Sequence, residues 1–590
     1  MNAGTATLRA QSHPLPTDAR KPVRGWLRAV SYAIVLLIAV GLCATRLSGP
    51  IDFRYDGAVY YVLGTSLAQG EGYRIISEPG APEGVQYPPA LPALIALHQL
   101  ILGTNDIAVV GPALRWTYIA MYLAYAAAML TLARRFAPPV LAVFGAVLCL
   151  GQVNAFLSSD MLFTELPFML TTVGFALVLS SRRLQSRLFA REGSAFVLAS
   201  IAFLLRAAGI GILAAWVGEA LFRRQWRLVV IRAVLAAVPF VGWQMHVSRV
   251  LKSEEYRHPA YEYQRAPYQF YNVTYAENMA LADPFRPEKG KANVGILAQR
   301  AVANFGVMLS AIGESVSEHN GFWRWLVRAP KETNENRGSF SHQLGRLPLF
   351  CLTAFTAVGL WVLARRRDWV IVLLIACSVA LVCSTPWPGQ FQRYLTPVAP
   401  FLTVALVLGM SRARQWFGTL RAPWALRWNR VLIGFCAMLV VLQVFSMTMV
   451  FRQRRADVAA FAAAHRANDP DWFYFDKTWL RFNEATDWIK AHAKPGEIVA
   501  TTSPHYVSLL TRLRAVMPPM EANVSEAQRL LDTVPVTWVI VDEMEFLDTA
   551  RVYARPVVEG ATDRWELAHR FGQTTVYRRI QGAEPAPGST

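Results

Sequence analysis

The chain is poor in cysteine and histidine, the usual ligands of structural metal ions. It has six cysteines and ten histidines among 590 residues, and neither a CxxC motif nor a His-linked spacing joins them. All six cysteines fall in or at the edge of apolar segments, which indicates small core residues. No glycine-rich phosphate loop is found in the C-terminal part, and no internal repeat divides the chain. These absences leave no sequence motif for a metal cluster or a bound nucleotide.

Acidic residues are also scarce, at 40 against 59 lysines and arginines, so the net charge is +19. The arginines cluster in short loops between apolar runs, as the positive-inside rule requires of a membrane protein. This distribution argues against a nucleic-acid partner. Hydrophobic residues make up 54% of the chain, and several stretches of about 17 to 25 apolar residues are long enough to cross a bilayer. We therefore expect a multi-pass protein of the inner (plasma) membrane.

The N-terminus reads as an uncleaved signal anchor after a cytoplasmic tail, residues 1–27. Basic residues precede the first apolar run, and no convincing small-residue cleavage site ends it. Apolar runs place spans at 28–48, 108–133, 138–157, 162–180, 195–222, 228–249, 346–364, 369–385, 394–411 and 430–451.

The run 195–222 has basic residues at both ends, so a single crossing would put one basic loop outside. Two short crossings that meet around Arg206–Gly209 return every basic loop to the cytoplasm. Each half has about 13 residues, or roughly 20 Å of helix, so the tip should lie below the outer surface. The sequence therefore predicts eleven crossings in a transmembrane domain 28–451, with the C-terminus extracytoplasmic.

This topology turns the acidic segments outward. The outer loops are 50–107, about 158–165, 250–345 and 386–393. Within the first, the short apolar run 88–103 favours a helix on the outer interface. The loop 250–345 carries six tyrosines that could cover a lipid or a sugar, although tyrosine is also common at interfaces. They are Tyr256, Tyr261, Tyr263, Tyr268, Tyr271 and Tyr275.

Residues 452–582 are expected to form an extracytoplasmic α/β domain, followed by a disordered tail at 583–590. Helical patterns cover 478–493 and 525–532, and extended runs cover 497–501, 538–541 and 574–577. The sequence favours a docking or stabilising module, and a role in gripping an acceptor stays open.

Five segments follow one another in an order that resembles the membrane glycosyltransferases of the GT-C superfamily. This group includes protein O-mannosyltransferases, aminoarabinose transferases of lipid A, and bacterial transferases of lipopolysaccharide core. The segments are RYDGAVYYVLGTSLAQGEGY, QYPPALP, SSDMLFTELPFML, FLLRAAGIGIL and QRYLTPVAPFL. The resemblance covers most of residues 25–450, and the order is more specific than any one motif. The chain departs from this pattern just before Pro88 and Pro89. Aminoarabinose-type relatives carry an acid and a Lys at these two positions, where this chain has Gln86 and Tyr87.

The resemblance implies an inverting transfer of a sugar from a polyprenyl-phosphate donor to a glycan, lipid or protein acceptor. Such a reaction needs a carboxylate to take the acceptor proton and cations to hold the departing phosphate. Asp56 is the candidate base; a helix cap or a surface charge is the alternative. Asp160 and Glu165 are candidates to orient the acceptor, or one of them caps a helix near Met161.

The cation candidates are arginines at membrane positions. Arg206 near the centre of an apolar run costs about 2.5–3.5 kcal/mol on insertion scales, so it needs a phosphate or an ion-pair partner. Arg393 with Tyr394 stands where an outer loop re-enters the membrane and is a second phosphate candidate, or an interfacial anchor. Tyr87 is an aromatic candidate for substrate binding. The sequence requires no cofactor, and the three carboxylates allow a divalent cation.

Two other classes of function compete with a glycosyltransferase. A transporter or flippase of a lipid-linked sugar would use charges near the midplane and paired, broken helices in two related halves. The missing repeat and the acids gathered at one face argue against it. A membrane scaffold would leave a buried Arg206 unexplained.

Overall fold

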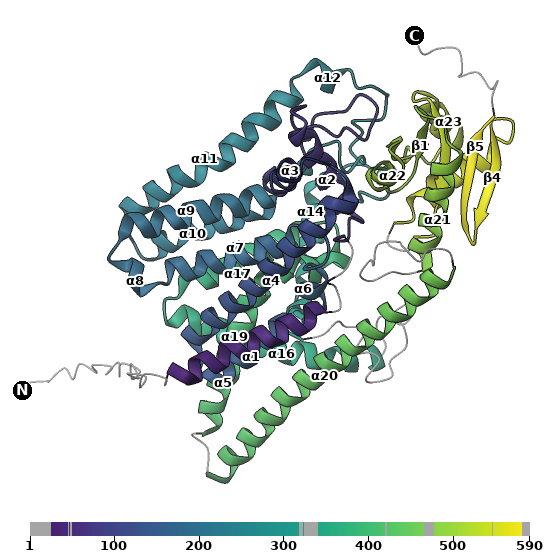
Figure 1. The fold of residues 1–590 in the computed structure, drawn as a ribbon. Coiled ribbons are helices and arrows are strands. Elements are labelled where there is room, and N and C mark those ends of the chain that lie inside the picture. The colour runs from purple at the N-terminus through teal and green to yellow at the C-terminus, as the bar shows by residue number, and fades with distance from the viewer. Residues whose placement is uncertain are drawn as a thin grey trace, which may run out of the picture.

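The computed structural model describes residues 25–44, 50–317, 340–418, 422–464, 477–544 and 547–580, with Leu47 and Trp323. A helical bundle carries a smaller α/β domain at one end (Figure 1). The predictions for the tails 1–24 and 583–590, and for loop residues 318–322 and 324–339, lie outside the described residues.

The predicted helical membrane fold is confirmed. Among the described residues, eight helices are long and apolar enough to cross a membrane by length and composition. Seven lie in α1 (Gly25–Cys43), α4 (Ile107–Phe136), α9 (Leu188–Leu205), α11 (Trp226–Leu251), α14 (Val294–Ser315), α16 (Phe340–Arg365) and α20 (Ala422–Ala464). The eighth, Pro388–Trp416, covers the short segment before α19 and most of α19 (Ala399–Gly418). Shorter apolar helices are α3 (Ala90–Leu102), α5 (Pro139–Leu150), α7 (Glu165–Leu179), α10 (Ile210–Phe222) and α17 (Trp369–Ser384). The eleven crossings and their orientation stay a prediction.

The short helices gather mostly in the connections between the long ones. They are α2 (Asp56–Ala68), α6 (Val153–Leu157), α8 (Arg182–Gln185), α12 (Glu254–Arg257), α13 (Tyr275–Met279) and α18 (Phe391–Leu395). Single 3-10 turns cover Ala207–Gly209, Pro287–Lys289, Pro388–Gln390 and Thr396–Val398.

The segment 195–222 is broken where the charge pattern predicted. Helix α9 ends at Leu205, Arg206 adopts an extended backbone (φ −155°, ψ 136°), and a 3-10 turn leads into α10. The two halves are unequal, however: α9 has 18 residues and α10 has 13. The predicted length of about 13 for each half was wrong for α9, because the helix begins at Leu188 and includes Arg191, which had ended the apolar run.

Helix α14 was not predicted, because its residues fall in the expected outer loop 250–345. The Asn304 side chain donates to the carbonyls of Cys383 and Thr385, at 2.8 Å each, at the C-terminal end of α17. The Ser315 carbonyl accepts from the Gln152 side chain, just beyond the end of α5. The chain continues from the end of α5 towards Glu165 and from the end of α17 towards Arg393. Because α14 is bonded at both of these places, it lies along the end of the bundle that carries Glu165 and Arg393.

Two glycines let α16 and α19 cross at very close range. A Cβ at Gly359 would overlap the backbone carbonyl of Ala405, and a Cβ at Gly409 would overlap that of Phe355. Any larger residue there would push the helices apart. This crossing fixes α19, which continues the segment that bears Arg393.

The C-terminal part folds as an α/β domain with a five-stranded sheet, as the sequence predicted in outline. The strand order is β2-β1-β3-β5-β4; β1 is parallel to β2 and β3, and β5 is antiparallel to β3 and β4. The strands are β1 (Ile498–Ala500), β2 (Arg514–Val516), β3 (Val536–Val541), β4 (Trp565–Phe571) and β5 (Thr574–Arg579). The helices are α21 (Lys477–His492), α22 (Pro504–Thr511), α23 (Val524–Asp532) and α24 (Arg555–Gly560), the last after a π-helical turn at Ala550–Ala554.

Strands β2 and β4 and helices α22 and α24 were missed. Strand β2 has three residues, and exposed polar residues interrupt β4, so neither carries a strong apolar pattern. The predicted helices and the other three strands match within two residues at each end.

The loop 50–107 and the loop after α11 meet at a buried carboxyl. Glu78 is 1% exposed and its Oε2 accepts hydrogen bonds from Asn272 Nδ2 (2.8 Å) and Tyr261 Oη (3.0 Å). Burial raises the pKa of the Glu78 carboxyl from 4.5 to about 7, and the hydrogen bonds only partly oppose this shift. The folded state therefore binds this proton more tightly than the unfolded state.

Because the folded pKa is raised, Glu78 contributes stability at low pH and loses it as pH rises through about 7. The loss should reach about 3 kcal/mol above pH 8. Glu78→Gln removes the ionisation. The thermal midpoint of the variant should therefore rise relative to that of the parent protein as the pH increases from 5 to 8. Thermal unfolding of both purified proteins in detergent measures this. Glu71→Gln, an exposed acid of the same loop, is the control, and parallel curves for Glu78→Gln would contradict the assignment.

Candidate functional site

Four charged side chains from four separate segments meet at one end of the bundle. We call Asp56, Glu165, Arg206 and Arg393 the four-charge cluster. Arg393 Nη2 lies 2.6 Å from Asp56 Oδ2, and Arg393 Nε lies 2.5 Å from Glu165 Oε1. Arg206 Nη1 lies 2.7 Å from the same oxygen of Glu165. The structure thus brings together four of the residues that the sequence singled out.

Helix ends supply these side chains. Asp56 is the first residue of α2 and Glu165 the first of α7, where the helix dipole favours a negative charge. Arg206 caps the C-terminus of α9, the end that favours a positive charge. The sequence placed Asp56, Glu165 and Arg393 near boundaries between apolar runs and loops, and Arg206 at the predicted break within an apolar run. The meeting of these places creates the site.

Exposure separates the roles of the four. The Glu165 side chain is 0% exposed, whereas those of Arg206, Asp56 and Arg393 are 19%, 22% and 27% exposed. Glu165 is thus an internal anchor for both arginines. The other three groups keep a face that a substrate can touch.

Aromatic rings surround the cluster. Tyr87 Oη donates to Asp56 Oδ1 at 3.2 Å. The Arg206 guanidinium lies 5.3 Å from the ring centre of Tyr394, and that of Arg393 lies 4.3 Å from Phe163. Such cation–π contacts hold the arginines without consuming all their N–H donors. Tyr87 and Tyr394, both predicted site residues, therefore lie at the cluster, and Phe163 was missed.

The tyrosine-rich loop after α11 separates into two groups. The Tyr271 ring lies 6.3 Å from that of Tyr87, and the Tyr275 ring lies 5.9 Å from that of Trp387. Burial raises the pKa of both phenols, and both interact electrostatically with Asp56 and Arg393. Tyr261 instead bonds Glu78. The sequence marked all six tyrosines alike, because only tertiary contacts tell a wall of the site from ordinary packing.

Asp160 forms a buried ion pair. Its Oδ1 lies 3.1 Å from Arg115 Nε, and both side chains are 1% exposed. Its backbone carbonyl accepts from Asp52, which ties the second outer loop to the first. The expected helix start near Met161 was wrong, because α7 begins at Glu165. These contacts favour a structural role for Asp160 over its predicted substrate role.

The carboxylates do not fit a divalent cation. Asp56, Asp160 and Glu165 each face an arginine, and a cation bound there would meet a positive charge at close range. Among the described residues, no group of three His, Cys, Asp or Glu side chains is placed to hold a metal ion.

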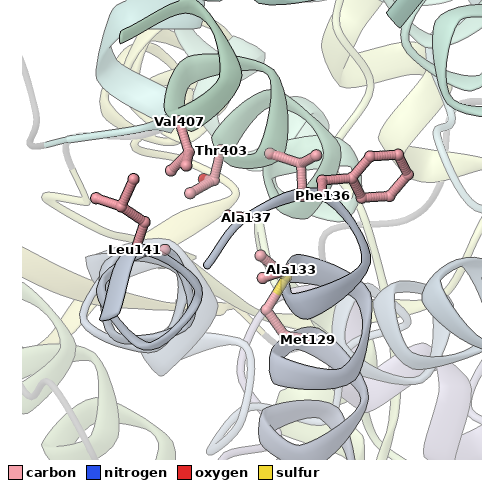
Figure 2. Close-up of a pocket in the computed structure, with 9 residues that line it drawn as sticks. Met129, Ala133, Phe136, Ala137, Leu141, Thr403 and Val407 are labelled. Carbon is pink, nitrogen blue, oxygen red and sulfur yellow. The ribbon is translucent and has the colours of Figure 1, made fainter. Parts of the chain in front are cut away.

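A small cavity lies away from these charges (Figure 2). The end of α4, the start of α5 and the middle of α19 line it with apolar side chains and Thr403. It has a volume of about 10 Å³, room for about one water molecule. The lining residues Ala133 and Phe136 stand on either side of the basic Arg134 and Arg135 in α4, at the end of the bundle opposite the cluster. The cavity is too small for a sugar, so it is a packing defect rather than a substrate site.

The fold is similar to those of several solved structures. A crystal structure of the Archaeoglobus fulgidus oligosaccharyltransferase, tethered with an acceptor peptide, has 14% identity and a TM-score of 0.51, covering 96% of this chain and 75% of that one. ArnT from Cupriavidus metallidurans in the apo state has 12% identity and a TM-score of 0.50, covering 94% and 98%. The same ArnT bound to undecaprenyl phosphate has 13% identity and a TM-score of 0.48, covering 94% and 98%. No family model and no curated protein sequence matches the chain. The chain shares its overall fold with the first two of these structures, whose TM-scores are 0.50 or above.

Asp160→Asn should destabilise the protein, because it leaves the buried Arg115 without its carboxylate. Removing one partner of a buried pair costs about 3–5 kcal/mol, so the folded yield and the thermal midpoint in detergent should fall. The double variant Asp160→Asn with Arg115→Met should recover much of this loss, because no charge is then left buried. If Asp160→Asn instead kept full stability and weakened substrate binding, the substrate role would hold.

Proposed function

We propose that this chain, which has the GT-C fold, is an inverting membrane glycosyltransferase. It moves a sugar from a polyprenyl-phosphate donor to a hydroxyl of a cell-envelope glycan, lipid or protein on the extracytoplasmic face. The observation that carries the proposal is the four-charge cluster, which combines one partly exposed carboxylate with two partly exposed arginines in an aromatic setting.

Asp56 is the base in this reaction. The acceptor oxygen attacks the anomeric carbon from the face opposite the phosphate, and its proton passes to Asp56. The new glycosidic C–O bond forms as the bond from the anomeric carbon to the phosphate oxygen breaks. Polyprenyl phosphate leaves with the bonding electrons, and the anomeric configuration inverts. Tyr87, which donates to Asp56 Oδ1, orients the carboxylate.

Arg206 and Arg393 hold the phosphate. Guanidinium groups suit phosphate oxygens because they donate two parallel hydrogen bonds. Glu165, fully buried against both arginines, presents them from behind. Both arginines are therefore already held beside the place where charge develops on the leaving phosphate.

Arg393 links phosphate binding to the readiness of the base. In the structure its Nη2 is engaged by Asp56 Oδ2 at 2.6 Å. A donor phosphate that takes this guanidinium frees Asp56 Oδ2 for the acceptor proton. The base is thus released when the donor is in place, which limits unproductive proton exchange.

Localisation follows from the same proposal. The basic loops belong in the cytoplasm, so the cluster and the C-terminal domain at the other end of the bundle face the extracytoplasmic side. A transporter of lipid-linked sugars needs its charged groups near the midplane, whereas these four lie at helix ends on one side. The assay below separates the two functions, because transport moves the donor without breaking its sugar–phosphate bond.

Asp56→Asn should lower sugar transfer by about 10²–10⁴-fold, the usual worth of a general base. It keeps the shape of the side chain, so expression and membrane insertion should stay normal. Transfer from a radiolabelled polyprenyl-phosphate sugar in membranes measures the effect. Asp106→Asn is the matched control, because Asn also serves as the N-cap that Asp106 provides for α4. Near-normal transfer by Asp56→Asn would remove Asp56 as the base.

Arg206→Met should raise the KM for the donor by at least about tenfold, or about 1.4 kcal/mol of lost binding. The thermal midpoint should fall only slightly, because Glu165 keeps Arg393 as a partner. Arg206→Lys, which keeps the charge, should lie between the two. Donor titrations and thermal unfolding of the purified variants measure both effects. A large loss of stability with an unchanged KM would show that Arg206 is purely structural.

A further inference from the structure

The backbone just before the proposed base is strained. Tyr55 has φ 58° and ψ −130°, a conformation that side-chain-bearing residues rarely adopt. Such conformations persist only where the surroundings enforce them, and they are common at functional sites. Because Asp56 follows directly as the first residue of α2, the Tyr55 backbone sets the direction in which the Asp56 carboxylate leaves the chain.

One of the groups that hold Tyr55 comes from the C-terminal domain, more than 400 residues away. Trp479 Nε1 of α21 donates to Tyr55 Oη at 3.1 Å. The two rings meet edge to face with their centres 5.2 Å apart. Trp479 is 1% exposed, so the donor of this hydrogen bond is shielded from water.

The same indole contacts the residue on the other side of Tyr55. The Arg54 guanidinium lies 5.3 Å from the centre of the Trp479 ring. Arg54 also pairs with Asp52 at 2.6 Å, with both side chains almost fully buried. Trp479 thus contacts both residues of the peptide bond between Arg54 and Tyr55.

The core of the C-terminal domain continues into the base-bearing segment. Trp479 packs edge to face on Phe482 and Tyr506 at 5.6 and 5.4 Å, and Ala58 of α2 belongs to the same buried cluster. A second contact lies alongside, where Ala515 N donates to the Ser77 carbonyl at 2.9 Å. Figure 1 shows α22 and α21 of the domain on the side of the bundle where α2 lies.

We infer that Trp479 is a positioning residue for Asp56: the C-terminal domain holds the strained Tyr55 through this indole and so aims the base at Arg393 and the acceptor. This inference rests on the proposed function and deepens it. It gives the C-terminal domain a part in the transfer step, distinct from binding any substrate itself.

The test uses the full-length protein and removes the hydrogen bond while keeping an aromatic ring. Trp479→Phe should lower kcat at least tenfold and leave the KM for the donor within about twofold, because the phosphate-binding arginines are untouched. Tyr55→Phe, which removes the acceptor oxygen, should have the same effect. The kcat of the double variant should be no lower than that of either single variant, because each of the three variants lacks the same hydrogen bond.

The matched control is Trp565→Phe. Trp565 is a tryptophan of the same domain, 2% exposed, whose Nε1 donates to Gln528 at 2.8 Å. Trp565→Phe removes a hydrogen bond donated by a similarly buried indole, without touching Tyr55, so this variant should keep the parental kcat. A fall in kcat equal to that of Trp479→Phe would show a general effect of weakening the domain and would overturn the inference.

Amide hydrogen exchange tests the positioning without relying on transfer. The amides of residues 55–61 should exchange at least tenfold faster in Trp479→Phe and at the parental rate in Trp565→Phe. Unchanged exchange in Trp479→Phe would overturn the inference whatever the activity. Faster exchange with an unchanged kcat would also overturn it. If the parental protein transferred no sugar while exchange still rose, the proposed function would fail and Trp479 would still hold this segment.

Discussion

The arrangement of the site depends on the buried carboxylate of Glu165. A charge with no exposed surface must be paired, because an uncompensated buried ion costs several kcal/mol. Two arginines satisfy it, one from the broken tip between α9 and α10 and one from the re-entrant segment before α19. Three parts of the bundle are thereby locked to one another at their ends. Within the part of the chain that the structure describes, the Asp56 carboxylate contacts this unit through Arg393 and Tyr87 alone, so it is the more easily released member.

The cluster is electrically balanced, with two carboxylates against two guanidinium groups. A balanced site can be stable before substrate arrives and still accept an anion, provided that one internal pair opens as the new one forms. The partial exposure of Arg206, Arg393 and Asp56 indicates which pair can open. The full burial of Glu165 indicates which cannot, because breaking its contacts would strand it away from water. Stability and anion binding thus use the same arginines with different partners.

A layer of aromatic and polar contacts joins the bundle to the C-terminal domain. Trp479 bonds Tyr55, the Ser77 hydroxyl meets His505 Nδ1 at 2.8 Å, and Tyr271 packs against the His505 ring. These contacts lie on the first outer loop and on the loop after α11, the two segments that also supply Asp56 and the tyrosines beside it. The domain therefore lies against the site rather than apart from it, and burial at this layer raises the pKa of Glu78 and lowers that of His505 to about 3.

The sequence by itself determined most of the apolar spans, the break at Arg206 and the α/β character of the tail. It also supplied the candidate residues Asp56, Glu165, Arg206, Arg393, Tyr87 and Tyr394. These follow from local properties: runs of apolar residues, positive charge between them, and charged or aromatic residues at the ends of spans. Only the tertiary structure decided that Asp160 pairs with Arg115, that Glu165 lies behind both arginines, that α14 lies along the end of the bundle, and that Trp479 reaches Tyr55. Each of these is a contact between segments far apart in the chain, and a local pattern carries no information on which distant partner a side chain will meet.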